Sequence, residues 1–336
     1  MTGSNLTIPA LATILLQHRD TNTSVAITSH VRPDGDAIGS CVGLYHILRA
    51  QGIAAHIIGL EPIPPRYQFL LEDVERLSPD NLRPSDYERL IVLDTGALDR
   101  APEFVSQWQK QVQTLNIDHH PTNTTFGTHN CIISDAAAVA EIITHLAVAA
   151  NWPVPLLAAN ALWVGIITDT GRFAYSCTTP DTLQAAAKLA AVGIDTPKID
   201  QQVFQTLPLG ALRLQARAID RMELHEQQRL AIITLSQQDF TECGANPEDA
   251  DEIINIPRRL DSVEIAILLT EKRNGTPQSL HTKASFRTRP PFDAALLCQT
   301  LGGGGHARAA GCELPCPLVQ AREQILTHVQ QAWFHS

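Results

Sequence analysis

The order of apolar segments predicts an α/β fold, in which a parallel-sheet N-terminal domain is joined by a helical linker to a smaller α/β C-terminal domain. Short β-branched runs alternate with helical patterns over residues 24–170, which is typical of a parallel sheet with helices on both faces. Helical patterns alone fill residues 180–225, and strand patterns resume at residue 230. We therefore expect a first domain over residues 1–195, a linker over 196–225 and a second domain over 226–336.

Four apolar runs in the first domain predict strands, at residues 25–28, 56–58, 90–93 and 115–117. Residues 38–48 predict a helix, because Val42 and Tyr45 share one face and Gly52 stands just past its end as a stop. Further helices are expected at residues 136–150 and 155–165. The short run Ile166-Ile167 that follows is expected to be a buried strand that leads to Asp169.

In the second half of the chain, the spacing of apolar residues predicts helices at 183–189, 198–204 and 212–222. Strands are expected at residues 230–234, 263–269 and 279–286. Four glycines then occupy residues 302–305 and are followed by His306. We expect the alanine-rich stretch that comes next to be helical.

Composition restricts the class of protein. The 336 residues are enough for two domains with separate cores, and no apolar run is long enough to cross a membrane. The seven cysteines are scattered and odd in number, which favours reduced thiols and a cytoplasmic location over a disulfide framework. The net charge of −10 argues against binding of long duplex DNA, because such binding needs basic surfaces that neutralise phosphates.

Segments rich in aspartate and histidine follow four apolar runs of the first domain. Their polar residues are His30, Asp34 and Asp36, then Asp94, then Asp118, His119 and His120, and finally Asp169. Parallel strands gather their carboxyl ends at one sheet edge, so we expect these side chains to converge. Because buried carboxylates repel one another unless cations lie among them, the pattern predicts a centre with two divalent ions that works on phosphoesters.

The first of these segments is open to two interpretations when it is taken alone. Pro33 and Gly35 bracket Asp34, so the chain leaves its strand in a tight, non-helical loop that can point the histidine and both carboxylates at one spot. The alternative is an Asp-rich turn that caps the following helix, where the helix dipole stabilises a carboxylate. The other three segments favour the metal-binding interpretation.

In combination, the four segments resemble the signature motifs of the DHH phosphoesterase family, with residues 118–120 as the triplet of its name. The second domain resembles the family's DHH-associated C-terminal domain, through residues 285–287, 302–306 and 309–311. The resemblance runs from about residue 24 to residue 312, and the subgroup it indicates is the bifunctional oligoribonuclease and phosphoadenosine-phosphate phosphatase (nanoRNase) type. It implies that the first domain is catalytic and that the second binds the substrate.

The resemblance also implies roles for the polar residues. One ion would be held by His30, Asp34 and Asp94, and the other by Asp36, Asp94, His119 and Asp169, so that Asp94 bridges. Mixed oxygen and imidazole ligands favour Mn²⁺, with Mg²⁺ and Co²⁺ as alternatives. Asp118 would orient a metal-bound imidazole, and His120 would face the substrate phosphate, either as a hydrogen-bond donor or as the acid that protonates the leaving oxygen.

For the second domain, the resemblance implies that the substrate is bound by Arg287, Gly303, Gly304, Gly305 and His306. Glycines let backbone N–H groups approach a phosphate or a nucleobase, and an arginine can pair with a phosphate; the alternative for the glycines is a flexible turn. Two departures from the family pattern concern substrate preference. Ala174 stands where the family often has a basic residue, and Pro290-Pro291 must end the Arg287 strand early.

These expectations lead to a metal-dependent hydrolase that degrades short oligoribonucleotides to mononucleotides and also hydrolyses the 3′-phosphate of phosphoadenosine phosphate. One alternative keeps the chemistry but acts on a linear or cyclic dinucleotide signal such as diadenylate. Another is a nucleotide-binding module with a degenerate site, which the complete set of ligand residues argues against. We expect no membrane partner, and the long linker and moderate apolar surface would permit a homodimer.

Overall fold

The computed structural model describes residues 5–17, 23–273 and 280–334. The chain divides into two compact units, Met1–Thr206 and Leu207–Ser336. The division falls inside the segment expected as a linker. In that segment, α7 (Thr196–Asp200) and a π-helix (Gln201–Gln205) belong to the first unit, whereas α8 (Leu209–Asp220) packs in the core of the second.

The first unit is built on a six-stranded parallel sheet with the strand order β3-β2-β1-β4-β5-β6. Its strands are β1 (Ser24–Thr28), β2 (Ala55–Ile58), β3 (Arg76–Leu77), β4 (Tyr87–Leu93), β5 (Gln113–Asp118) and β6 (His129–Ile132). The four strands expected from apolar runs are thus confirmed. The two edge strands were not expected, because they are short and carry polar residues such as His129 and Asn130.

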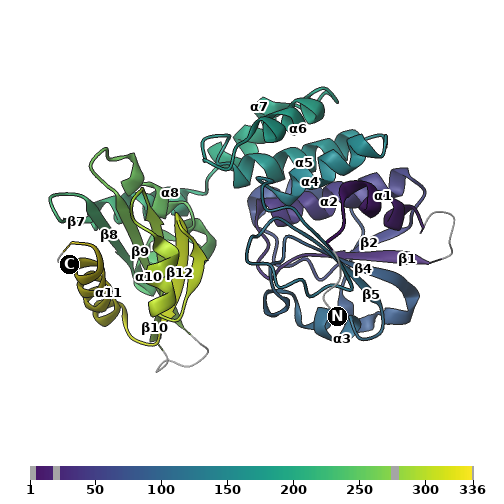
Figure 1. The fold of residues 1–336 in the computed structure, drawn as a ribbon. Helices are drawn as coiled ribbons and strands as arrows, with labels where there is room; N and C mark the ends of the chain where they lie inside the picture. The colour runs from purple at the N-terminus through teal and green to yellow at the C-terminus, as the bar shows by residue number, and fades with distance from the viewer. Residues whose placement is uncertain (1–4, 18–22, 274–279, 335–336) are drawn as a thin grey trace. The chain divides into compact units, whose positions relative to one another are not determined.

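Helices cover both faces of this sheet, as Figure 1 shows. Alternate residues of each strand enter opposite cores: Ile91 and Leu93 pack under the larger helical layer, whereas Leu90 and Val92 pack against α3 (Glu103–Trp108). The larger layer contains α1 (Ile8–Leu16), α2 (Gly35–Ala50), α4 (Val139–Ala149), α5 (Leu156–Asp169) and α6 (Pro180–Ala190). The α/β prediction is confirmed.

One expected strand of the first unit is wrong. α5 continues without a break to Asp169, so Ile166-Ile167 is the last turn of a helix and not a strand. A short apolar run cannot by itself distinguish a buried strand from a buried helical turn. Three of the four acidic segments therefore follow strands, and the fourth stands at the end of a helix.

A line of glycines on α2 lets α5 pack unusually close to it. Gly35, Gly39 and Gly43 are four residues apart and so share one face of the helix. A Cβ atom added at Gly39 would lie 2.4 Å from the carbonyl oxygen of Ala161, and one at Gly35 would lie 2.4 Å from Thr168 Oγ1. This close approach brings the end of α5 beside the loop that follows β1.

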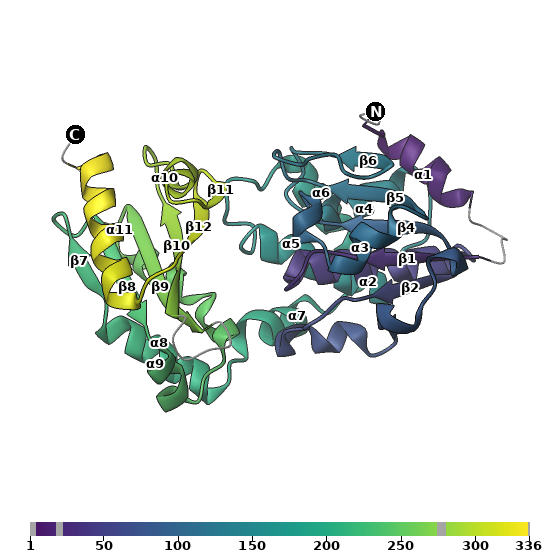
Figure 2. The same ribbon diagram turned by 90° about the horizontal axis from the view of Figure 1, so that it is seen from below.

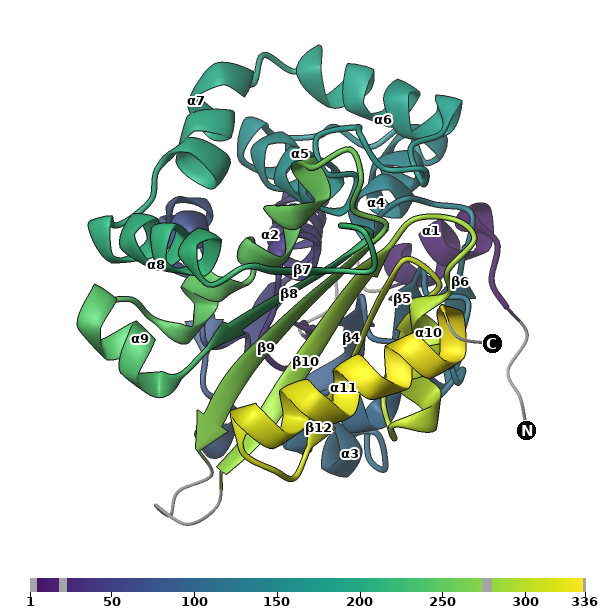
Figure 3. The same ribbon diagram turned by 90° about the vertical axis from the view of Figure 1, so that its left-hand side faces the viewer.

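The second unit is a smaller six-stranded sheet with the order β11-β12-β10-β9-β8-β7, in which only β8 and β9 run parallel. α10 (Ala294–Thr300) and α11 (Leu318–Trp333) cover one face of this sheet, and α8 and α9 (Gln237–Cys243) cover the other (Figures 2 and 3). Each pair of helices forms a separate hydrophobic core with the sheet. The strands are β7 (Glu223–His225), β8 (Leu230–Leu235), β9 (Ile265–Arg273), β10 (Leu280–Thr288), β11 (Gly304–His306) and β12 (Ala309–Leu314). The expected second α/β domain is confirmed.

The alanine-rich stretch after His306 is a strand, β12, and the expected helix there is wrong. Ala310, Cys312 and Leu314 are buried and alternate with more exposed neighbours, which is the period of a strand. Pairing with β10 outweighs the helix preference of alanine. β10 ends before Pro290-Pro291, as predicted, whereas Ser279 of the expected strand 279–286 lies outside the described residues.

Candidate metal centre

The loop after β1 leads into α2 through Asp34, which is the N-cap of the helix. Its Oδ1 accepts the backbone N–H groups of Asp36 and Ala37, both at 3.1 Å, and its Oδ2 lies 3.9 Å from His30 Nε2. One carboxylate oxygen therefore caps the helix and the other faces the cluster. The helix-cap interpretation is confirmed for Oδ1, and Oδ2 stays free of this cap for the predicted metal contact.

Asp36 lies in the first turn of α2 and is fully buried. Its Oδ1 accepts Ser40 Oγ at 2.9 Å and the backbone N–H of Ala140 at 3.0 Å, and its Oδ2 accepts the N–H of Val139 at 2.6 Å. Val139 and Ala140 begin α4, whose first N–H groups have no partner within the helix. Burial and the charge of Asp94 raise the pKa of Asp36 to about 7.

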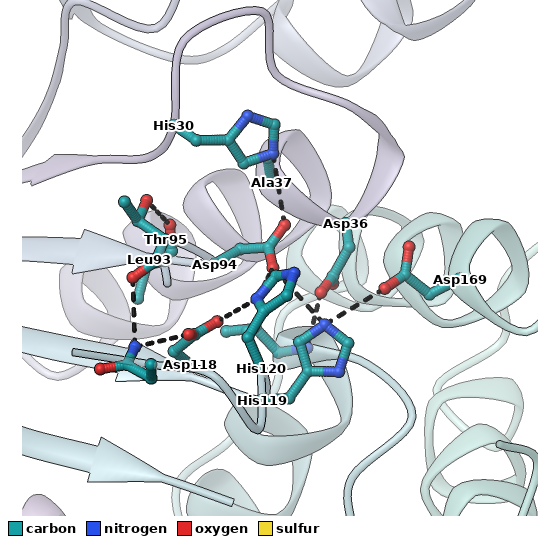
Figure 4. A network of polar contacts seen from close by, with 12 residues as sticks. His30, Asp36, Ala37, Leu93, Asp94, Thr95, Asp118, His119, His120 and Asp169 are labelled. Carbon is teal, nitrogen blue, oxygen red and sulfur yellow. Dashed lines mark hydrogen bonds and ion pairs between the residues drawn. The ribbon is translucent and has the colours of Figure 1, made fainter. Parts of the chain in front are cut away.

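Asp94 occupies the centre of the cluster, directly after β4. Its Oδ2 lies 3.5 Å from His30 Nε2, and its Oδ1 lies 3.5 Å from His119 Nε2 (Figure 4). The residue is buried, and Oδ1 has no hydrogen-bond partner among the described residues. An unsatisfied buried carboxylate oxygen is costly without a cation, so this atom is suited to metal binding.

Asp169 reaches the same cluster from the end of α5. Its Oδ2 lies 3.5 Å from His119 Nε2. The other ring nitrogen of His119, Nδ1, is 3.1 Å from the carbonyl oxygen of Ala136, so Nε2 is directed at the carboxylates. Histidines that bind metals are commonly held in this way through their second nitrogen. Sequence reasoning missed the Ala136 contact, because a backbone carbonyl has no residue signature.

Asp118, the last residue of β5, contacts His120 and not His119. Its Oδ1 lies 2.7 Å from His120 Nδ1, and its Oδ2 accepts Asn123 Nδ2 at 2.5 Å. Although burial opposes the charged imidazole, Asp118 and Asp94 raise the pKa of His120. We expected Asp118 to orient an imidazole that binds a metal. The imidazole that it contacts is instead that of His120, which we expected to face the substrate phosphate. Asn123 was not anticipated from the sequence.

The pKa shifts of the carboxylates and imidazoles in the cluster indicate that positive charge is favoured there. Burial raises the pKa of Asp169 well above its usual range, and the charges of Asp36, Asp34 and Asp94 add to this rise. Burial alone would lower the pKa of His30, but Asp34 and Asp94 raise it to about 11, and Asp94 and Asp169 raise that of His119 to about 11 as well. Buried carboxylates in this number favour positive charge among them.

The donor atoms are spaced as metal ligands. Three groups have ligand atoms within 4.8 Å of one another, namely His30-Asp34-Asp94, Asp36-His119-Asp169 and Asp94-His119-His120. Nitrogen and oxygen ligands each about 2.0–2.2 Å from one ion stand about 3–3.6 Å apart, which matches the 3.5 Å separations around Asp94 and His119. The chemistry and spacing of these residues therefore fit divalent cations.

The five candidate substrate residues lie together at one end of the second sheet. Arg287 on β10 and His306 on β11 both pair with Ala309 of β12, so their side chains share a face of the sheet. Gly303 is needed for packing, since an added Cβ would lie 2.2 Å from the Gly311 carbonyl oxygen, whereas Gly304 has open space around it. Gly304 and Gly305 pair with β12 in a hairpin, whereas Gly302 lies in the turn before it and Gly303 connects the two.

Comparison with known proteins decides the family. Residues 24–166 match the DHH family, N-terminal domain, and residues 228–333 match the DHHA1 domain. The bifunctional oligoribonuclease and PAP phosphatase NrnA of Thermus thermophilus is 31% identical over 311 residues, which cover 91% of this chain and 89% of that protein. This chain belongs to the DHH phosphoesterase family. As a DHH phosphoesterase it is a hydrolase, and members of its family depend on metal ions.

A second sequence relative and one solved structure are also similar to this DHH phosphoesterase. NrnA of Bacillus subtilis is 25% identical, with 87% of this chain and 89% of that protein covered. The crystal structure of an exopolyphosphatase-related protein from Bacteroides fragilis superposes with a TM-score of 0.85, over 96% of this chain and 95% of that chain, at 24% identity. Among the described residues, none of the helices combines the length and apolar character needed to cross a membrane.

Proposed function

We propose that this DHH phosphoesterase cleaves short oligoribonucleotides to mononucleotides and removes the 3′-phosphate of phosphoadenosine phosphate. The observation that carries the proposal is Asp94, whose two oxygens each lie 3.5 Å from a different imidazole. A carboxylate in this position can join two ions, as phosphoesterases with two-metal sites require. The names of the relatives from Thermus thermophilus and Bacillus subtilis support the substrate class.

The ligand residues in this proposal are those that the family resemblance implies, and the spacing of their donor atoms supports them. His30, Asp34 and Asp94 would hold one ion, and Asp36, Asp94, His119 and Asp169 would hold the second. Two divalent cations supply positive charge and Lewis acidity at the phosphate group. Mixed carboxylate and imidazole ligands favour Mn²⁺ as the ion, and Mg²⁺ and Co²⁺ are the ions to compare with it.

The remaining polar residues act on the substrate. His120, held through Nδ1 by the buried carboxylate of Asp118, presents its Nε2 edge to the phosphate group of the substrate and donates to it. In the second unit, Arg287 pairs with a phosphate of the substrate, and the glycine hairpin and His306 form the rest of the binding surface. The acidic net charge favours a short nucleotide over a long polyanion.

A panel of small phosphorylated nucleotides tests the proposal. Purified protein is incubated with Mn²⁺, Mg²⁺, Co²⁺ or a chelator, and the products from a linear diadenylate, phosphoadenosine phosphate and cyclic diadenylate are separated. We expect the linear dinucleotide and phosphoadenosine phosphate to yield AMP, fastest with Mn²⁺ and not at all with chelator. A metal-loaded protein that turns over neither of these two contradicts the proposal.

The cyclic dinucleotide is included because of one relative. The cyclic-di-AMP phosphodiesterase PdeA of Listeria monocytogenes is 24% identical over 92% of this chain, but this chain spans only 48% of that protein. Faster turnover of the cyclic form than of the linear form would reassign the substrate to the signalling class. The metal chemistry would be the same in both cases.

A further inference from the structure

The side chain of Asn123 lies directly behind the Asp118–His120 pair. Its Nδ2 donates to Asp118 Oδ2 at 2.5 Å and also lies 2.9 Å from Asn116 Oδ1. Its Oδ1 accepts the backbone N–H of Thr125 at 2.6 Å, and this contact fixes which end of the amide faces the carboxylate. The Asp118 carboxylate is therefore held on both sides, with His120 at one oxygen and Asn123 at the other.

The loop that carries Asn123 is tied to the loop that follows β4. Asn123 Nδ2 lies 3.2 Å from the carbonyl oxygen of Thr95, and the backbone N–H of Thr124 donates to the carbonyl oxygen of Gly96 at 2.8 Å. Thr125 has a φ of 53°, a left-handed conformation that a β-branched residue adopts only when its surroundings impose it. The amide of Asn123 is thus fixed from both loops.

We infer that Asn123 is a positioning residue of the reaction, which acts on His120 through Asp118. The role rests on the function proposed above. Because Asn123 occupies Oδ2 of Asp118, Oδ1 accepts from His120 Nδ1, and this bond directs the Nε2 edge of the ring to the phosphate group. In the described part of the chain, no hydrogen bond joins Asn123 to a proposed metal ligand, so both ions should bind without it.

A double-mutant cycle on the full-length, Mn²⁺-loaded protein tests this inference. Asn123→Ala should lower kcat on the linear dinucleotide about 10- to 100-fold, the range typical of residues that support a functional imidazole. KM and the number of bound ions should stay near the wild-type values. In a His120→Gln background, the same substitution should change kcat less than about twofold, because residues that act through one another are not additive.

Asn130→Ala is the matched control. Asn130 is also a buried amide, and it bonds both the N–H and the carbonyl oxygen of Gly127, at 3.0 and 2.9 Å. Its loss should lower the melting temperature but not kcat. Should Asn123→Ala fail to fold, Asn123→Ser keeps a hydroxyl donor and allows the same cycle with a smaller loss.

Two results would overturn the role of Asn123. One is an equal fall in kcat in both backgrounds, and the other is no fall in kcat when Asn123 is replaced. A wild-type protein that binds its ions but cleaves neither the linear dinucleotide nor phosphoadenosine phosphate would instead refute the proposed function, and the role with it. The wild-type assay thus separates the two failures.

Discussion

At the scale of single residues, Asp94 stands out because its backbone is held in a conformation that aspartate seldom adopts. Its φ is 51°, in the left-handed region, and its backbone N–H donates to the carbonyl oxygen of Ile117 at 3.0 Å. Left-handed residues outside glycine are concentrated at functional sites, where the surrounding structure imposes them. Here the neighbouring strand β5 imposes the turn that places the carboxylate between two imidazoles.

Replacing Asp94 tests the bridge. Asp94→Asn keeps the shape of the side chain but removes its charge, so we expect both ions to bind poorly. Activity should fall by more than about 100-fold, beyond the 10–100-fold typical of residues that only support a ligand. Metal content after dialysis and turnover of the linear dinucleotide are the measurements. Asp99→Asn, an exposed change in the same loop, serves as the control, and a fully loaded and active Asp94→Asn protein would refute the ligand assignment.

Most of the candidate site could be predicted from residue types alone. His30, Asp94 and His119 carry side chains whose chemistry is specific, and each follows a recognisable strand. The supporting contacts could not be predicted in this way. Asn123 is a common loop residue, and Ala136 contributes only its carbonyl oxygen, so neither has a signature before the chain is folded.

At the scale of elements, the glycine face of α2 determines where Asp169 stands. Because α5 packs directly on that face, its last residue reaches His119 although no strand carries it there. The sequence interpretation expected Asp169 to follow a strand, but the residue ends a helix, and its carboxylate lies 3.5 Å from His119 Nε2. The same limit applies to β12, since alanine and short apolar runs take the structure that their tertiary partners require.

A methyl group added to this glycine face should weaken both the packing of α5 and the binding of one ion. In Gly39→Ala the new Cβ would lie 2.4 Å from the backbone of Ala161, and overpacking of this kind costs about 1–3 kcal/mol. We expect a lower melting temperature and weaker binding of the ion that Asp169 holds, with the other ion retained. Titration with Mn²⁺ and thermal unfolding measure both effects.

Ala50→Ser, on the exposed end of the same helix, should lower stability by no more than a few tenths of a kcal/mol and leave the binding of both ions unchanged. Two ions of unaltered affinity in Gly39→Ala would show that the close approach of α5 is not needed for the centre.

At the scale of the whole molecule, the acidic cluster belongs to one unit only. All the proposed metal ligands lie within Met1–Thr206, whereas Arg287 and the glycine hairpin lie within Leu207–Ser336. The cations should therefore stabilise the first unit and not the second. The sequence predicted a helical linker over residues 196–225, and the division between the units falls inside it, at Thr206. The position within that helical stretch had no signal of its own in the sequence.

Calorimetry of the full-length protein tests this division. A ligand at 100 times its Kd adds about 2.7 kcal/mol to the stability of the state that binds it, which corresponds to a rise of about 5–10 °C in a unit of this size. We expect each bound Mn²⁺ to raise the transition of the first unit by about this amount and to leave the other transition unmoved. Asp94→Asn should abolish the rise, and equal shifts of both transitions would contradict the assignment.

Asp36 has a consequence for how inactive variants are interpreted. The carboxylate that is offered to a cation also closes the first turn of α4 through the N–H groups of Val139 and Ala140. A substitution at Asp36 removes a helix cap together with a proposed metal ligand, so a loss of turnover there would have two causes. Among the described contacts, the side chain of Asp169 caps no helix. A substitution at Asp169 is therefore the better way to remove a proposed ligand while the fold is kept.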